Sequence, residues 1–366
     1  MAINFSTLVD AAFQHNASDI HLVQDNQIYL RINGVMRQIA GPALTRPELE
    51  QFLAQILPAT QKPSLEQRRC ADFAWQPDAR MRFRVSAYYE RERMRVVMRL
   101  IKIRIATVEE LELPDTIKTI AGWQRGMVIM TGVTGSGKST TMAAIINHIN
   151  ANESRCIITI EDPIEMVHEN IKSIVSQREV GRDVESFRAG LVQALRQDPD
   201  VILIGEMRDP ETISTALRAA ETGHYVFSTM HTSNALHTVE RILAEFEERE
   251  HRLILEQLAN NLRATITQRL VRRTGGGGRV AALEIMIVND MVRKLLQENQ
   301  ITSIGTVIRE RRDGMMLFDQ HLADLVRTKI IEDAEAYKYV EDEAAFRRYL
   351  KGHLATADRG GIVGVM

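Results

Sequence analysis

Apolar and polar positions follow two different patterns along the chain, and the change falls near residue 126. In the first hundred residues, apolar side chains recur at helical spacing over 5–13 and again from about 47 to 57. Strand-like runs lie at 18–23, 28–32, 35–39, 71–75, 81–88 and 94–101. Asn33-Gly34 joins the second and third runs and suits a two-residue hairpin turn. These elements predict a small mixed α+β domain over residues 1–102.

A different alternation begins at residue 126, where short apolar strands are separated by stretches long enough for amphipathic helices. The strands are predicted at 126–130, 156–160, 201–205 and 225–230, with one more at 280–287 after the glycine run 275–278. This alternation predicts a mostly parallel sheet with helices on both faces, and hence an α/β fold class. We expect a linker over 103–114, an α/β core over 115–288, a helical region over 289–350 and a flexible tail over 351–366.

Composition and charge place the protein in the ordinary globular class. The 366 residues are 45% hydrophobic, which suffices for two domains with separate cores. The formal net charge of −2 gives no basic face, so no nucleic-acid partner is expected. Cys70 and Cys156 each stand alone, which favours a reducing compartment and no zinc. Because a signal-like N-terminus and a long apolar run are both lacking, we expect a cytoplasmic protein.

The segment 131–140, TGVTGSGKST, carries the strongest chemical signal. It fits the pattern G-x-x-x-x-G-K-[ST] between a predicted strand and a predicted helix, the context in which such a loop wraps phosphates. Lys138 can reach the β and γ oxygens, and Ser139 can ligate Mg²⁺. An incidental glycine-rich turn is the alternative, but it leaves the flanking strand and helix unexplained. The predicted nucleotide-binding residues are Gly132, Thr134, Gly135, Ser136, Gly137, Lys138, Ser139 and Thr140.

Hydrolysis also needs a carboxylate to orient water, and two predicted strands end in acidic residues. The run VILI is followed by Glu206, with Gly205 where many P-loop ATPases have an aspartate. The run CIITI is followed by Glu161, Asp162 and, three residues later, Glu165. Parallel strands would bring both acidic ends to the edge that carries the glycine-rich loop. Each end alone is more often a solvated loop, but the two together favour a catalytic, Mg²⁺-binding role.

Two histidines bracket the predicted strand 225–230. A lone histidine at a strand end is usually a hydrogen-bonded structural residue. His231 follows the strand, so it would lie at the same edge as the loop and is better placed to sense the γ-phosphate. His224 precedes the strand, and we expect a supporting or signalling role for it.

Arginines are concentrated in the strands of the first domain. The alternation over 81–85 puts Arg82 and Arg84 on one strand face, opposite the apolar one, and Arg99 lies in the next strand. A solvated strand face is the simpler interpretation for most of these arginines. An arginine from a neighbouring subunit is, however, a common way to stabilise charge on a transferred phosphoryl group. Arg82, Arg84 and Arg99 are the candidates for that role.

Four motifs in order, TGVTGSGKST, TIEDPIE, GEMRDPET and AAETGHYVFSTMHT, resemble the Walker A, Asp box, Walker B and His box of the secretion and pilus motor ATPases. The resemblance extends from about residue 17 to 350. It implies a PAS-like N-terminal domain, a RecA-like ATPase domain and a hexameric ring that binds ATP and Mg²⁺ between subunits. It also implies catalytic roles for Glu206, Glu165, His231 and His224, with Ser139, Glu165 and Glu206 on the Mg²⁺ side.

Two features resemble the pilus retraction branch of this family, the PilT/PilU type. The segment 268–273, QRLVRR, is followed by TGGGGR rather than by the four-cysteine zinc element of the extension and type II secretion branch, whose N-terminal region is also larger. Segments such as RFRVSAYY, REVGRD and GMMLFDQHL, and the extended tail after residue 333, are similar to PilU. At 291–298 the chain keeps only part of the PilT motif linked to retraction. A PilU-like retraction ATPase is therefore favoured.

The resemblance implies partners as well as chemistry. They are further copies of the chain, a PilT-type ATPase, and an inner-membrane pilus platform protein at the cytoplasmic face of that membrane. Three alternatives stay open: a catalytically weak regulatory partner of a PilT-type ATPase, an extension or type II secretion ATPase, and a RecA-like DNA translocase. The missing cysteines disfavour the second alternative, and the charge balance disfavours the third.

Overall fold

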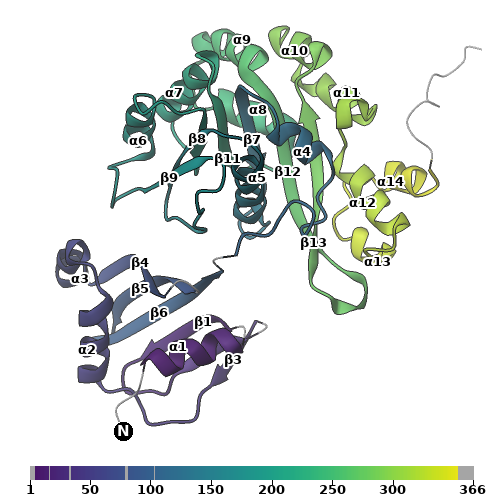
Figure 1. Cartoon of the computed structure of the whole chain (residues 1–366). Coiled ribbons are helices and arrows are strands. Elements are labelled where there is room, and N and C mark those ends of the chain that lie inside the picture. The colour runs from purple at the N-terminus through teal and green to yellow at the C-terminus, as the bar shows by residue number, and fades with distance from the viewer. Residues whose placement is uncertain (1–4, 16, 33, 79–80, 103, 353–366) are drawn as a thin grey trace, which may run out of the picture. The chain divides into compact units, whose positions relative to one another are not determined.

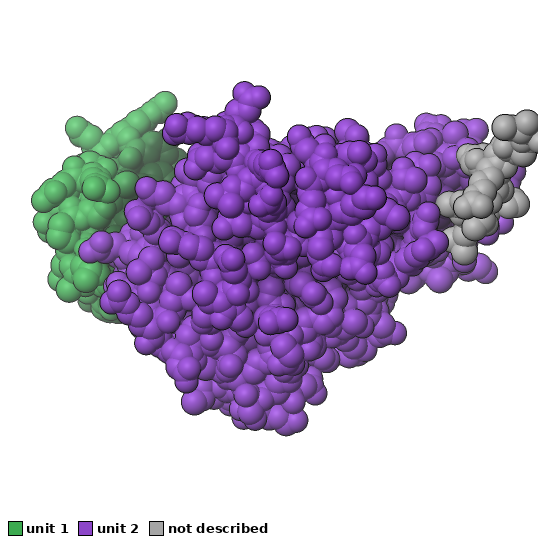
Figure 2. Space-filling view, turned by 90° about the horizontal axis from the view of Figure 1, so that it is seen from above, with its two compact units in different colours: residues 1–104 green, residues 105–366 purple. Residues whose placement is uncertain are grey.

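The computed structural model describes residues 5–15, 17–32, 34–78, 81–102 and 104–352. The chain divides into two compact units, residues 1–104 and 105–366, which are coloured separately in Figure 2. This division lies inside the predicted linker. Val108 and Leu113 are buried in a core of the second unit, so the later part of that predicted linker packs on the second unit. No helix among the described residues is long and apolar enough to span a bilayer.

The first unit is an antiparallel sheet in the order β3-β2-β1-β6-β5-β4 with helices packed on it (Figure 1). Ile32 pairs with Val35 across the predicted hairpin, and Gly34 has a φ of 81°; Asn33 lies outside the described residues. Alternate residues of β5 face the core, as the sequence pattern predicts. The elements are α1 (Phe5–Gln14), β1 (Ala17–Val23), β2 (Tyr29–Ile32), β3 (Val35–Gln38), α2 (Arg46–Ile56), η1 (Ala59–Gln61), α3 (Lys62–Arg68), β4 (Cys70–Asp78), β5 (Met81–Glu90) and β6 (Arg93–Lys102).

The second unit is built on a seven-stranded sheet in the order β13-β12-β7-β11-β10-β8-β9. Neighbouring strands from β12 to β9 pair in parallel, and only β13 pairs antiparallel, with β12. The strands are β7 (Gly126–Thr131), β8 (Cys156–Glu161), β9 (Ile174–Glu179), β10 (Val201–Ile204), β11 (Tyr225–Met230), β12 (Leu262–Arg272) and β13 (Arg279–Ile287). The sheet is thus mostly parallel, as predicted, although β9 and β12 were not among the predicted strands.

Helices cover both faces of this sheet, because alternate residues of each strand belong to different cores. One core joins Val128, Met130 and their neighbours to α4 and α5, and the other joins Met127 and Ile129 to helices from α6 to α11. The helices of these two cores are α4 (Thr116–Ala121), α5 (Lys138–Asn152), α6 (Phe187–Ala194), α7 (Pro210–Glu221), α8 (Ala235–Leu243), η2 (Glu248–Glu250), α9 (His251–Asn261), α10 (Asp290–Gln297), η4 (Ile301–Ser303) and α11 (Ile304–Arg309).

The predicted helical region after residue 289 consists of short helices rather than long ones. Its last part packs on β12 and β13 through a separate core that contains Val271, Val280 and Phe346. The remaining elements are η3 (Thr274–Gly276), η5 (Arg312–Gly314), α12 (Phe318–Arg327), α13 (Asp333–Ala336) and α14 (Glu343–Leu350). The predicted tail lies outside the described residues from 353 onward.

Candidate active site

Four neighbouring parallel strands deliver the predicted site segments to one edge of the sheet. Strands β7, β11, β10 and β8 lie side by side in that order. The loop 132–137 follows β7, His231 follows β11, and Glu206 lies two residues after β10. The acidic segment 161–165 begins at the last residue of β8. Segments far apart in the sequence therefore meet where the carboxyl ends of parallel strands commonly form ligand sites.

The glycine-rich loop is already folded into a tight turn over the start of α5. Gly132 has a φ of 138° and Gly137 a φ of 87°, values that favour glycine. Lys138 is the first residue of α5 and is buried, and its Nζ donates to the carbonyl oxygens of Gly132 at 2.6 Å and Val133 at 3.2 Å. The first N–H groups of α5 have no partners within the helix, so this end of α5 suits an anion.

The Lys138 ammonium lies in the field of two carboxylates. Burial lowers the pKa of Lys138 below its usual value, whereas the charges of Glu206 and Glu165 oppose that shift. The charges of Glu206 and Glu165 therefore act on Lys138 at this end of the sheet. A cation between a phosphate loop and two carboxylates can balance charge on a phosphoryl group.

Glu206 has a basic side chain on each side. Its side chain is 17% exposed, and Oε2 accepts a hydrogen bond of 2.6 Å from Nη2 of Arg208. His231 Nε2 lies 3.5 Å from Oε1 of the same carboxylate. Arg208 was not among the predicted site residues, although it lies within the quoted segment GEMRDPET. Its guanidinium engages one oxygen of the Glu206 carboxylate.

At the acidic end of β8, Glu161 makes hydrogen bonds within the protein, whereas Glu165 is exposed. Glu161 accepts from Thr159 Oγ1 at 2.6 Å and from Gln177 Nε2 at 3.0 Å, and burial raises its pKa. Glu165 is exposed in the segment that follows. Both bonds end on Oε1 of Glu161, and the exposure of Glu165 makes it the better candidate of the two for a ligand.

Gly205 is closely packed, which explains why no aspartate stands there. A Cβ at this position would lie 3.2 Å from the Ile160 carbonyl oxygen and 3.2 Å from a ring carbon of Phe187. Both neighbours belong to packed elements, so a larger side chain would force them apart. The acidic groups of the site must therefore come from Glu206 and from the segment after β8.

His224 lies away from this site, at the opposite end of β11. Tyr225, the next residue, pairs with Gly126 at the start of β7, whereas the loop follows the end of β7. His224 Nδ1 is 2.9 Å from the Ala219 carbonyl oxygen and 3.1 Å from Thr222 Oγ1. The sequence-based grouping of His224 with the catalytic residues is not supported within one chain, because a six-residue strand separates the two histidines by roughly 20 Å.

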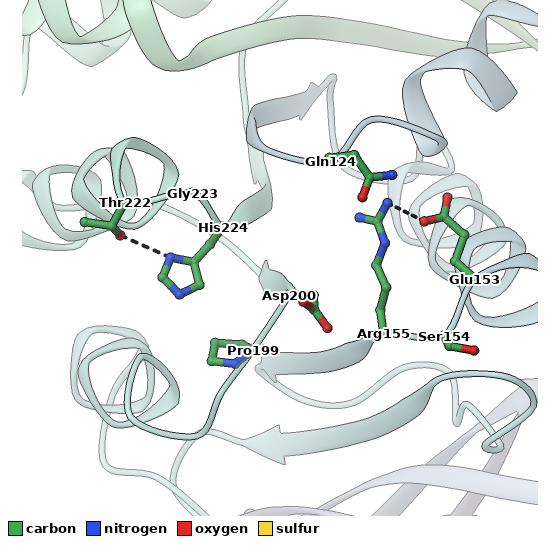
Figure 3. A pocket seen from close by; sticks show the side chains of 9 residues that line it. All are labelled: Gln124, Glu153, Ser154, Arg155, Pro199, Asp200, Thr222, Gly223 and His224. Carbon is green, nitrogen blue, oxygen red and sulfur yellow. Dashed lines mark hydrogen bonds and ion pairs between the residues drawn. The ribbon is translucent and has the colours of Figure 1, made fainter.

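Around His224 there is a polar cavity of about 350 Å³, shown in Figure 3. Arg155 points into the same region and pairs with Glu153, and its Nη1 donates to the Trp123 carbonyl oxygen at 3.1 Å. Asp200 lines the cavity and accepts from the Cys156 N–H at 2.7 Å. These bonds connect the amino ends of neighbouring strands. His224 therefore lies among residues that hold the structure together, away from the phosphate loop.

The three candidate arginines all lie on the outer face of the first unit's sheet, but their surroundings differ. Arg84 is exposed and pairs directly with Arg99 across β5 and β6. Arg99 is 68% exposed and donates from Nε to Asp19 at 2.9 Å. Arg82 is buried, so it is the least available of the three. Two arginines placed directly opposite each other repel, and the Asp19 carboxylate offsets part of that repulsion.

Comparison with known proteins assigns nearly the whole chain to one family. A family described as type II/IV secretion system protein matches residues 2–347. The chain belongs to this family. A protein named "Twitching motility protein" from Neisseria gonorrhoeae is 43% identical over 314 residues, which cover 86% of this chain and 84% of that protein. The "Type IV pilus ATPase PilU" of Pseudomonas aeruginosa is 34% identical over 350 residues, covering 95% and 92% of the two chains.

A solved structure agrees with this assignment. The crystal structure of the pilus retraction motor PilT with bound ADP has a TM-score of 0.89 and 37% identity, and it covers 94% of this chain and 99% of its own. The predicted α/β fold class, with an N-terminal domain before an ATPase domain, is confirmed. The chain is a member of a family of nucleotide-binding ATPases. Identities of 37% and 34% do not separate the PilT and PilU types, so the PilU-like assignment stays a prediction.

Proposed function

We propose that this protein is an ATP-hydrolysing motor that powers or assists retraction of type IV pili. The observation that carries the proposal is the meeting of the phosphate loop, Glu206 and His231 at one sheet edge, in a chain whose close relatives are named for twitching motility and pilus retraction. Relatives of the type II secretion branch are also similar, at 32% identity, but this chain lacks the four-cysteine element expected of that branch.

The proposed nucleotide site is the loop from Gly132 to Thr140. Its backbone N–H groups and the N-terminus of α5 would hold the phosphates, and Lys138 would leave its two loop carbonyls for the phosphate oxygens. Hydroxyl and carboxylate oxygens of Ser139, Glu165 and Glu206 are hard donors that fit Mg²⁺. When bound, Mg²⁺ would neutralise charge on the phosphate oxygens.

Glu206 is the proposed group that orients the attacking water. It is partly shielded, and it lies beside His231, which is placed to respond to the γ-phosphate. Arg208 engages Oε2 of Glu206, and Oε1, on the side of His231, is the oxygen proposed to act on water.

The remaining proposals concern assembly. The ring is proposed to be a homohexamer in which arginines of one subunit's first unit, above all Arg84 and Arg99, approach nucleotide bound to a neighbour. The proposal is supported by the exposure of both side chains, which leaves guanidinium N–H groups available to a phosphate. The proposed partners are an inner-membrane platform protein and a PilT-type ATPase, at the cytoplasmic face of the membrane.

ATP turnover of the purified protein, compared with that of its Lys138→Ala variant, tests the proposal. The particle mass is measured in the same buffer with ATP and Mg²⁺. We expect turnover that the variant abolishes, in a particle of about six subunits. A particle that binds ATP but hardly turns it over would contradict an autonomous motor and favour the regulatory alternative, in which this chain acts beside a catalytic ATPase.

A further inference from the structure

A buried glutamine of β12 lies directly under the phosphate loop. Gln268 is 1% exposed, and both ends of its amide are used. Nε2 donates to the Ser136 carbonyl oxygen at 2.8 Å, and Oε1 accepts from Thr141 Oγ1 at 2.8 Å. Ser136 belongs to the loop, and Thr141 lies in the first turn of α5. One side chain therefore connects a neighbouring strand to the loop and to the helix that follows it.

Two of the loop glycines are packed against this same residue. A Cβ at Gly132 would lie 2.4 Å from the Gln268 carbonyl oxygen, and a Cβ at Gly137 would lie 2.7 Å from its Nε2. At Gly135, by contrast, a Cβ would have no heavy atom within 4 Å. The need for glycine at positions 132 and 137 thus comes partly from contact with Gln268, whereas at 135 it comes from the backbone angle alone.

The strand segment that carries Gln268 is held on both sides. Thr267 shares a hydrogen bond of 2.8 Å with Thr131, the last residue of β7. Arg269 lies over the Phe318 ring at 4.3 Å, and its Nη1 donates to the Tyr339 carbonyl oxygen at 3.3 Å. The contacts of Thr267 and Arg269 therefore fix the backbone of β12 on both sides of Gln268. The Gln268 side chain has little freedom to follow a movement of the loop.

The hydrogen bond from Gln268 also sets the direction of a loop peptide. In a trans peptide, the carbonyl and the following N–H point in opposite directions. Because the Ser136 carbonyl is turned toward Gln268, the N–H of Gly137 is turned away from β12. A loop that is ordered before its ligand arrives loses less conformational entropy on binding than one that must be ordered by the ligand.

We propose that Gln268 is a positioning residue that holds the loop in its phosphate-binding shape. The inference rests on the proposed nucleotide binding by this loop and extends it to a side chain outside the motif. Because Gln268 acts on the loop and touches none of the reacting atoms, its loss should weaken the binding of phosphate groups and leave the hydrolysis of bound ATP nearly unchanged.

The test compares Gln268→Met, which keeps the length but removes both hydrogen bonds, with the wild-type protein. We expect the Kd for ADP and the Kd for pyrophosphate each to rise about tenfold. The kcat at saturating ATP should change less than about threefold, so that the KM for ATP carries the effect. Pyrophosphate is included because it contains only the part of the nucleotide that the loop would hold.

Two further variants separate positioning from general damage. Thr265→Val changes a buried residue of the same strand whose hydroxyl makes no hydrogen bond among the described residues, so it should leave both Kd values unchanged. Gln268→Glu keeps the acceptor for Thr141 but offers no donor to the Ser136 carbonyl, and it should weaken binding at least as much as methionine does. If the Gln268→Met variant does not fold, the Gln268→Glu variant tests the same role.

The measured Kd values test two claims separately: the positioning role of Gln268 and the binding of nucleotide by the loop. Unchanged Kd values in the folded Gln268 variants would overturn the positioning role, as would equal weakening in Thr265→Val or a loss confined to kcat. Wild-type protein that binds neither ADP nor pyrophosphate would overturn the proposed nucleotide site and the role of Gln268 together. Binding by the wild type that Lys138→Ala abolishes, with no effect at Gln268, would overturn only the role of Gln268.

Discussion

At the scale of single residues, Glu206 is the group whose change should separate nucleotide binding from hydrolysis. Glu206→Gln keeps the size of the side chain but removes the negative charge that would orient and deprotonate water. We expect ATP turnover to fall at least about a hundredfold. The Kd for ADP should change less than about threefold, because the phosphate contacts come from the loop and Lys138. Phosphate release and equilibrium binding of ADP measure the two effects.

A glutamate nearby in the sequence provides the matched control for this prediction. Glu211 lies in the first turn of α7 and forms an exposed ion pair with Arg188. Glu211→Gln removes the same charge and should leave both turnover and binding unchanged. Wild-type turnover in the Glu206 variant would show that another group activates the water.

Single residues were predictable from the sequence only where a motif marks them. Lys138 and Glu206 were found because each stands at a fixed place after an apolar strand. Gln268 has no such signal, since its importance comes from two hydrogen bonds made in three dimensions. His224 and His231 share one segment of sequence, but β11 lies between them and places them at its opposite ends.

At the scale of elements, a buried acid and a buried histidine at β13 give opposite responses to pH. Glu284 accepts from the N–H of Ala235 at the start of α8, and burial raises its pKa to about 7. His321 Nδ1 accepts from the Leu283 N–H, and burial lowers its pKa to about 4. As the pH rises from 4.5 to 7, burial of the Glu284 carboxyl costs stability, because the unfolded state loses that proton first. As the pH falls from 6.5 to 4, burial of the His321 ring costs stability, because the unfolded state gains a proton first.

Glu284→Gln should therefore stabilise the protein at alkaline pH. The folded-state pKa of Glu284 lies above its ordinary value of 4.5, so ionisation at pH 8 costs on the order of 3 kcal/mol of unfolding free energy. Glutamine can still accept from Ala235 without that charge. We expect the gain to shrink below about 1 kcal/mol at pH 5, where the folded state keeps its proton. Chemical denaturation at both pH values measures it.

The control for this prediction is Glu240→Gln, on the exposed side of α8. It should show no comparable gain at either pH. A stability difference at Glu284 that is the same at pH 5 and pH 8 would mean that the side chain acts through packing rather than through its charge.

Most elements were predictable, and the two missed strands show where local pattern fails. Strand β9 has polar residues on both faces because it forms the edge of the sheet, so it shows no apolar alternation. Strand β12 begins at Leu262, directly after α9 ends at Asn261, so no turn signal separates them. Residues 262–267, LRATIT, do alternate apolar and polar side chains, so the strand signal is present but runs on from a helix without a break.

At the scale of the whole molecule, the proposal assigns the nucleotide and the arginines to different units of different subunits. The phosphate loop belongs to residues 105–366, and the opposed arginines Arg84 and Arg99 belong to residues 1–104. If the arginines are supplied by a neighbouring subunit, Arg84→Ala should lower turnover at least about tenfold even though the variant's own loop is intact. Arg46→Ala, at an exposed ion pair of α2, should leave turnover unchanged.

Mixed assemblies distinguish a neighbour's arginine from a subunit's own. An Arg84→Ala subunit has an intact loop, whereas a Lys138→Ala subunit has an intact arginine. In rings that contain both variants in equal amounts, half of the loops are intact and half of those face an intact arginine. Turnover should then recover to about a quarter of the wild-type value, whereas each variant alone should keep no more than about a tenth. If turnover does not recover in rings of confirmed mixed composition, each subunit must supply its own arginine, because mixing restores nothing when both groups come from one chain.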